Sequence, residues 1–225
     1  VARRLASDFR VLAVDLRNHG RSPRADGMSY QAMAEDLTRL LEAQEIGNAA
    51  LIGHSMGGKV AMWLALSRPQ LVDRLLVADI APVTYPSRFS AITGALTGLN
   101  LEEIRDRRDA DKRLAAQVPD PALRDYLLQN LVRQGSTWRW RIHLGALDAG
   151  MSEILSFPEA AGRQYAGPVL FIYGTESDYV AGAHLGIIRT LFPLARLRAL
   201  PGAGHWVYAE QPDAFVRALR GFLTR

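Results

Sequence analysis

Short apolar runs and helical repeats alternate along most of the chain. Runs of strand length occupy residues 9–14, 49–53, 75–78 and 168–174, and residues 195–200 are predicted to form a further strand. Apolar residues recur at helical spacing over 29–45, 56–67, 187–192 and 212–223, and residues 1–7 have the pattern of a helix end. Because the runs are continuous rather than alternating, both faces of each strand should be covered. The pattern predicts a mostly parallel α/β sheet flanked by helices.

The alternation breaks between residues 83 and 159. Helical patterns fill most of this region, over 89–96, 101–116 and 121–133, followed by a short segment at 138–142 and a turn at 152–157. No apolar run of the earlier strand type occurs there. We therefore predict a core formed by 1–82 and 160–225 and a helical cap, 83–159, inserted over the strand ends, with apolar residues that seat the cap or line a substrate pocket.

Length and composition fit one α/β domain that carries an insertion, at 225 residues. The chain has no cysteine, which excludes disulfides, thiolate metal sites and a cysteine nucleophile. No apolar run approaches the length of a membrane span, and the start is not a signal peptide. These features predict a cytoplasmic protein that does not associate with membranes.

The net charge of +4 raises the question of a nucleic-acid partner. The densest basic stretch, 102–113, interleaves arginine and lysine with glutamate and aspartate. Mixed signs at this spacing are typical of a solvated helix, with a surface that attracts anionic substrates as the alternative. No nucleic-acid partner is expected.

The stretch Gly53-His54-Ser55-Met56-Gly57 joins a predicted strand to a predicted helix. Such a strand–turn–helix holds a serine in a strained conformation at its tip, and Gly53 and Gly57 are expected there for lack of room. We predict that Ser55 is a nucleophile and that the Met56 N–H, at a helix N-terminus, stabilises an oxyanion. The alternative is a tight structural turn.

A serine nucleophile requires a histidine base and a carboxylate that orients it. His205 is the best base, because it lies in a glycine-rich loop after the last strand and follows the serine in chain order. Asp79 and Asp178 both end strands at the required edge, so either is a candidate acid.

Other side chains are candidates for substrate contact. His54 adjoins the nucleophile and should point away from it, which favours packing over substrate binding. His19 could line a pocket or stabilise its own turn by a hydrogen bond, and Trp206 follows the predicted base. The histidines form no metal-ligand cluster, and no cofactor is expected.

Four motifs together resemble the α/β-hydrolase esterases of the bacterial YbfF type: residues 15–23, 53–59, 79–82 and 202–206. The resemblance covers nearly the whole chain and is weakest in the cap. It implies the α/β-hydrolase fold, hydrolysis of carboxyl esters or acyl thioesters of short to medium acyl chains, and Ser55 and His205 as nucleophile and base. It also implies Asp79 as the acid, although this chain has Asp178 as well.

The resemblance further implies earlier strands and a His-Gly loop that supplies a second oxyanion N–H. The chain starts after that loop, so we expect the sequence to be an N-terminally incomplete record. Without the second donor, the rate should fall by roughly 10²- to 10³-fold.

The predicted partner is a small-molecule acyl ester or thioester. Carbon–carbon hydrolases, lyases and perhydrolases share the triad, and some members of the fold are ligand receptors, so these remain alternatives. The sequence predicts no particular oligomeric state.

Overall fold

The computed structural model describes residues 1–87 and 90–224. The chain forms two compact units, which are considered separately below. The first unit comprises Val1–Val14, Tyr30–Thr84 and Ser156–Arg225, and the second comprises Asp15–Ser29 and Tyr85–Leu155. The second unit therefore includes residues 15–29, which the sequence placed in the core. That the second unit acts as a cap stays a prediction.

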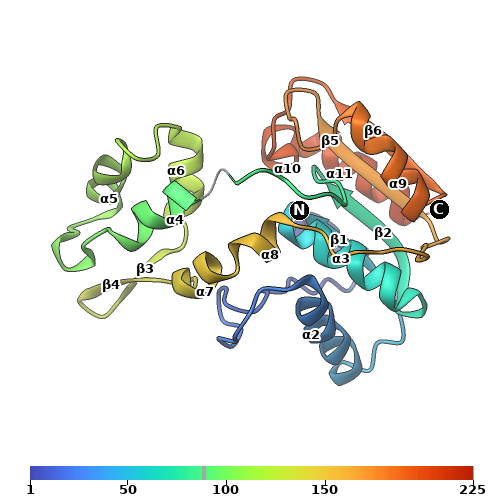
Figure 1. The fold of residues 1–225 in the computed structure, drawn as a ribbon, viewed down its shortest axis with the longest axis horizontal. Helices are drawn as coiled ribbons and strands as arrows, with labels where there is room; N and C mark the ends of the chain where they lie inside the picture. The colour runs from blue at the N-terminus through green and yellow to red at the C-terminus, as the bar shows by residue number, and fades with distance from the viewer. Residues whose placement is uncertain (88–89, 225) are drawn as a thin grey trace. The chain divides into compact units, whose positions relative to one another are not determined.

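The first unit is built on a parallel sheet in the strand order β1-β2-β5-β6 (Figure 1). Its strands are β1 (Ala49–His54), β2 (Val72–Ala78), β5 (Val169–Gly174) and β6 (Ala195–Leu200). Its α-helices are α1 (Ala2–Leu5), α2 (Tyr30–Ala43), α3 (Met56–Ser67), α9 (Leu185–Leu191), α10 (Val207–Glu210) and α11 (Pro212–Leu223). Short 3-10 helices, η1 (Pro69–Leu71) and η3 (Gly182–His184), complete it. This confirms the predicted parallel α/β sheet flanked by helices.

Alternate residues of the central strands face two different layers of helices. Leu76 and Ile172 belong to a buried cluster with residues of α1, α10 and α11. On the opposite face, the Phe171 ring packs edge-on against Phe192, at the end of α9, with centroids 5.9 Å apart. Burial of the strands on both faces explains why they appear as continuous apolar runs in the sequence.

The predicted strand at residues 9–14 is wrong. This segment has no regular secondary structure, and Leu12 and Val14 are 42% and 44% exposed. A run of apolar residues becomes a strand only where a neighbouring strand accepts its backbone hydrogen bonds. Among the described residues, β1 is an edge strand that pairs with β2 alone.

The second unit is mostly helical, with one antiparallel hairpin. It contains α4 (Ser90–Thr97), η2 (Leu101–Glu103), α5 (Arg107–Leu114), α6 (Pro121–Leu128), β3 (Leu131–Gln134), β4 (Thr137–Trp140), α7 (Leu144–Ala149) and α8 (Met151–Leu155). The helix expected over 89–96 is present as α4, although Phe89 lies outside the described residues.

Some predicted elements of this unit have other bounds or types. The helix predicted over 121–133 ends at Leu128, because the chain turns into the β3–β4 hairpin. Gly135, with a φ of 63°, lies in the hairpin turn, where a glycine adopts the left-handed region readily. The pattern over 101–116 is split into η2 and α5, and the predicted turn at 152–157 contains the end of α8.

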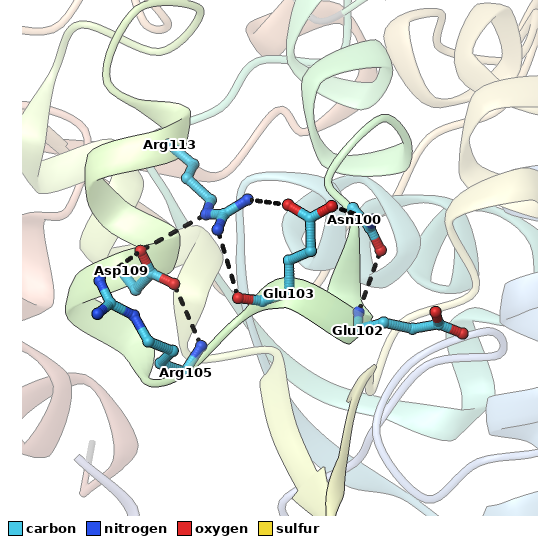
Figure 2. A network of polar contacts seen from close by, with 6 residues as sticks. All are labelled: Asn100, Glu102, Glu103, Arg105, Asp109 and Arg113. Atoms are coloured by element: carbon cyan, nitrogen blue, oxygen red, sulfur yellow. Dashed lines mark hydrogen bonds and ion pairs between the residues drawn. The ribbon is translucent and has the colours of Figure 1, made fainter.

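Charges of both signs pair along the stretch that raised the nucleic-acid question (Figure 2). Arg113 forms an ion pair with Glu103 at 2.7 Å, and Arg105 forms one with Asp109 at 3.5 Å. The hydrogen bond from Arg113 lowers the pKa of Glu103. Within α5, Arg113 also pairs with Asp109, four residues earlier, at 3.5 Å, and this is the pairing that mixed signs at helical spacing predict.

None of the helices within 1–87 and 90–224 has the length and apolar character that a membrane crossing requires.

Candidate active site

The predicted strand–turn–helix is formed by β1, Ser55 and α3. Ser55 has a φ of 52° and a ψ of −123°, a backbone conformation that side-chain-bearing residues rarely adopt. Two hydrogen bonds hold it there: the Ser55 N–H donates to Ala78 O at 3.1 Å, and the Lys59 N–H donates to Ser55 O at 3.1 Å. The turn is therefore fixed both to the neighbouring strand β2 and to the first turn of α3.

Close packing in this turn requires one of the two predicted glycines. A Cβ at Gly53 would collide with the backbone of Gly57 and Gly58. A Cβ at Gly57 would meet nothing within 4 Å outside its own helix, so the expectation that Gly57 is needed for lack of room is wrong. The second crowded position is Gly58, where a Cβ would lie 2.7 Å from Ile80 Cγ2.

Asp79 follows β2 directly and is fully buried, at 0% exposure. Its φ of 51° is also in the left-handed region. The His205 Nδ1–H donates to Asp79 Oδ2 at 2.7 Å, and the Gly174 N–H donates to Oδ1 at 3.0 Å. A carboxylate partner on Nδ1 places the ring proton there, which leaves His205 Nε2 free to accept a proton.

The loop after β5 contacts this acid–base pair through residues that the sequence did not single out. The Ser177 hydroxyl donates to Asp79 Oδ2, and the Tyr179 ring stacks on His205 with centroids 4.2 Å apart. Asp178, between them, is exposed. The only signal in the sequence was their position at a strand end on the expected edge of the sheet.

His54 faces the loop that carries His205. Its Nε2–H donates to His205 O at 2.9 Å, and its ring lies 4.5 Å from the His205 ring and 5.0 Å from that of Tyr208. Burial, reinforced by the nearby His205, lowers the pKa of His54 to about 4. Its ring is therefore neutral at neutral pH, with its one N–H proton on Nε2, where it bonds to the carbonyl. These contacts correspond to the packing role that the sequence favoured.

The other candidates lie in different surroundings. Trp206 places its ring 5.8 Å from that of His205, centroid to centroid. Met56 is the first residue of α3, so its N–H lies at the N-terminus of a helix. His19 belongs to the second unit, where its Nδ1 lies 2.9 Å from Arg17 O, a hydrogen bond within its own turn. No group of His, Asp and Glu side chains suited to a metal ion occurs among the described residues.

Lys59 is a buried amine one turn beyond Ser55, at 1% exposure. Its Nζ donates to Ser156 O at 2.6 Å and lies 5.6 Å from the centroid of the Tyr30 ring. Burial lowers its pKa to about 7. The sequence gave a hint of this position, because Lys59 directly precedes the apolar run Val60–Leu66.

The carboxyl ends of the parallel strands thus bring a strained serine, a buried carboxylate and a histidine to one edge of the first unit. His54 connects Ser55 with His205, because it precedes Ser55 in the chain and its side chain is hydrogen-bonded to His205 O. Ser55 follows β1, Asp79 follows β2 and His205 lies in the loop after β6. A serine, a carboxylate and a histidine after the strands of one parallel sheet are the residue types that a serine hydrolase triad uses.

Comparison with known families decides the assignment of the fold. The model of the alpha/beta hydrolase family matches residues 1–218. The chain belongs to this family.

Named relatives match most of the chain. It is 43% identical to the sn-1-specific diacylglycerol lipase ABHD11 of Mus musculus over 96% of this chain and 72% of the relative. It is 37% identical to the esterase YbfF of Escherichia coli K12 over 100% of this chain and 86% of the relative. A solved structure, a marine microorganism esterase, superposes with a TM-score of 0.94 at 37% identity and covers 98% of this chain and 87% of that one.

Proposed function

We propose that this protein is a serine hydrolase of carboxylic esters that acts through an acyl-enzyme on Ser55. The observation that carries the proposal is the 2.7 Å hydrogen bond between His205 Nδ1 and the buried Asp79, in a loop held against the residue next to Ser55. The names of the bacterial and marine relatives, both esterases, support the same reaction class.

In the first half-reaction, Ser55 Oγ attacks the acyl carbonyl carbon while His205 Nε2 takes its proton. The bond to the leaving alcohol then breaks, and Nε2 returns the proton to that alcohol. In the second half-reaction, water attacks the acyl-enzyme and gives a proton to Nε2, which returns it to Ser55 as the acid leaves.

Asp79 contributes by staying fixed beside the histidine. Its two carboxylate oxygens receive hydrogen bonds from His205, Gly174 and Ser177, so its orientation does not depend on solvent. A fixed carboxylate stabilises the imidazolium that forms when Ser55 loses its proton. The Met56 N–H, at the start of the 12-residue α3, donates to the developing oxyanion.

The substrate class is proposed to be small-molecule esters or acyl thioesters with short to medium acyl chains. The mouse relative carries the name of a diacylglycerol lipase, so longer acyl esters belong in the same trial. Each class has the acyl carbonyl that the proposed nucleophile attacks.

The test is hydrolysis of a series of p-nitrophenyl esters and acyl thioesters of increasing chain length. Ser55→Ala should lower kcat by about 10⁴-fold or more, because a triad acts as a unit. Ser136→Ala, an exposed serine in the hairpin turn, is the matched control and should leave kcat unchanged. Equal rates for wild type and Ser55→Ala would contradict the proposal.

A further inference from the structure

The loop that carries His205 has no regular secondary structure, yet its backbone is held by hydrogen bonds to side chains. Residues 202–206 join β6 to α10. The Gly204 N–H donates to Glu210 Oε2 at 2.7 Å, and the Trp206 N–H donates to Glu210 Oε1 at 3.0 Å. Between them, His205 O accepts the hydrogen bond from His54 Nε2. Side chains thus bind one main-chain group in each of three successive residues, Gly204, His205 and Trp206.

We propose that His54 and Glu210 are positioning residues that fix the backbone of His205, so that its imidazole meets both Asp79 and Ser55. The proposal rests on the function proposed above and adds two residues to its machinery. Neither side chain need touch the substrate, because both act on the main chain of the loop.

His54 is suited to this role by its place in the chain. It is the last residue of β1 and precedes Ser55, so the strand that ends at the serine also holds the carbonyl of His205. The ring of Tyr208 meets that of His54 edge-on, and Tyr208 in turn contacts Phe215 at 6.3 Å between centroids. Phe215 belongs to the buried core, so the position of His54 is set by the packed interior.

Glu210 holds the loop from the opposite end. It is the last residue of α10, and its two carboxylate oxygens bind the N–H groups on either side of His205. Hydrogen bonds from N–H groups to a carboxylate are stronger than those to a neutral acceptor. A displacement of about 1 Å at a reacting group can lower the rate by about 10²-fold, so a loop that carries the base benefits from such restraint.

The experiment compares His54→Phe, His54→Gln, Glu210→Gln and Asp213→Asn on the full chain. His54→Phe keeps a ring but removes the donor, whereas the side-chain amide of His54→Gln can donate from a similar place. Glu210→Gln replaces one acceptor oxygen by a donor. Asp213→Asn is the matched control, because Asp213 pairs with Arg4 and not with the His205 loop.

We expect His54→Phe and Glu210→Gln to lower kcat by about tenfold with KM within about twofold, the size expected for loss of one hydrogen bond. His54→Gln should recover most of the loss, and Asp213→Asn should match wild type. In proton NMR, the downfield resonance of the His205 Nδ1–H should broaden or disappear in the two impaired variants alone.

Two results would overturn the proposal. One is wild-type kcat and an unchanged Nδ1–H resonance in both His54→Phe and Glu210→Gln. The other is a loss of activity that is explained by a lower Tm of the variants and that His54→Gln does not restore. The NMR measurement needs no turnover. If Ser55→Ala hydrolysed esters as fast as wild type, the proposed function would fail while the positioning of His205 could still be read.

Discussion

The buried Lys59 should make the stability of the protein rise with pH. The residue is 1% exposed, and burial lowers the pKa of its side chain from 10.5 to about 7. Between these two pH values, the unfolded chain binds a proton on this lysine that the folded chain does not bind. The free energy of unfolding therefore increases with pH across this window, by about 1.4 kcal/mol per pH unit when the difference is one proton.

The expected gain in the free energy of unfolding is about 2 to 3 kcal/mol between pH 7.5 and 9.5. The free energy continues to rise until the pH passes the unfolded pKa of 10.5. Lys59→Met removes the titrating group and should abolish this slope. Lys112, which is exposed, is the only other lysine, so Lys112→Met is the matched control and should keep the wild-type slope.

Urea unfolding at pH 7.5, 8.5 and 9.5 measures the free energy of unfolding of the three proteins. The upper limit of pH 9.5 avoids the titration of Tyr165. Burial raises the pKa of Tyr165 from 10.0 to about 12, so above pH 10 this residue makes the free energy of unfolding fall as the pH rises. A wild-type slope no steeper than that of Lys59→Met would refute the reasoning.

The remaining predictions concern the acid and the turn at Ser55. Asp79→Asn should lower kcat by about 10⁴-fold, because it favours the wrong tautomer of His205, whereas the exposed Asp178→Asn should stay within about twofold of wild type; comparable losses in steady-state ester hydrolysis would contradict the assignment of Asp79. Gly53→Ala should destabilise the fold by about 1 to 3 kcal/mol because its methyl meets backbone, whereas Gly57→Ala should be neutral or stabilising by up to about 1 kcal/mol in a helix; thermal unfolding compares them, and equal Tm values would be evidence against the crowding at Gly53.

The sequence predicted those elements that are determined by the pattern of their own residues. β2 and β5 lie where continuous apolar runs occur, since strands buried on both faces require such runs. β1 and β6 were also predicted, although both are partly exposed and β6 has arginine at two positions. The segment 9–14 has the same pattern but forms no strand, because pairing depends on a neighbour and not on the segment itself. The turn after Leu128 was missed for a related reason: Leu131 fits a helical repeat and a buried strand position equally well.

The site was predictable in its residue types but not in all its contacts. Ser55 and His205 stand out through glycines that surround them. Asp79 and Asp178 both end strands, and only the three-dimensional structure shows that Asp79 is buried beside His205 while Asp178 is exposed. The contacts of Glu210 with the His205 loop could not be found from the sequence, because an exposed glutamate in a short helix resembles any surface residue.

The central claim, that Ser55 is the nucleophile, is tested most directly by covalent labelling. A fluorophosphonate reacts with a serine that a neighbouring base activates, and peptide mapping by mass spectrometry locates the adduct. We expect a single adduct on the peptide that contains Ser55, prevented by an ester substrate and absent from Ser55→Ala. Ester hydrolysis by a protein that carries no adduct, or an adduct on another residue, would contradict the account.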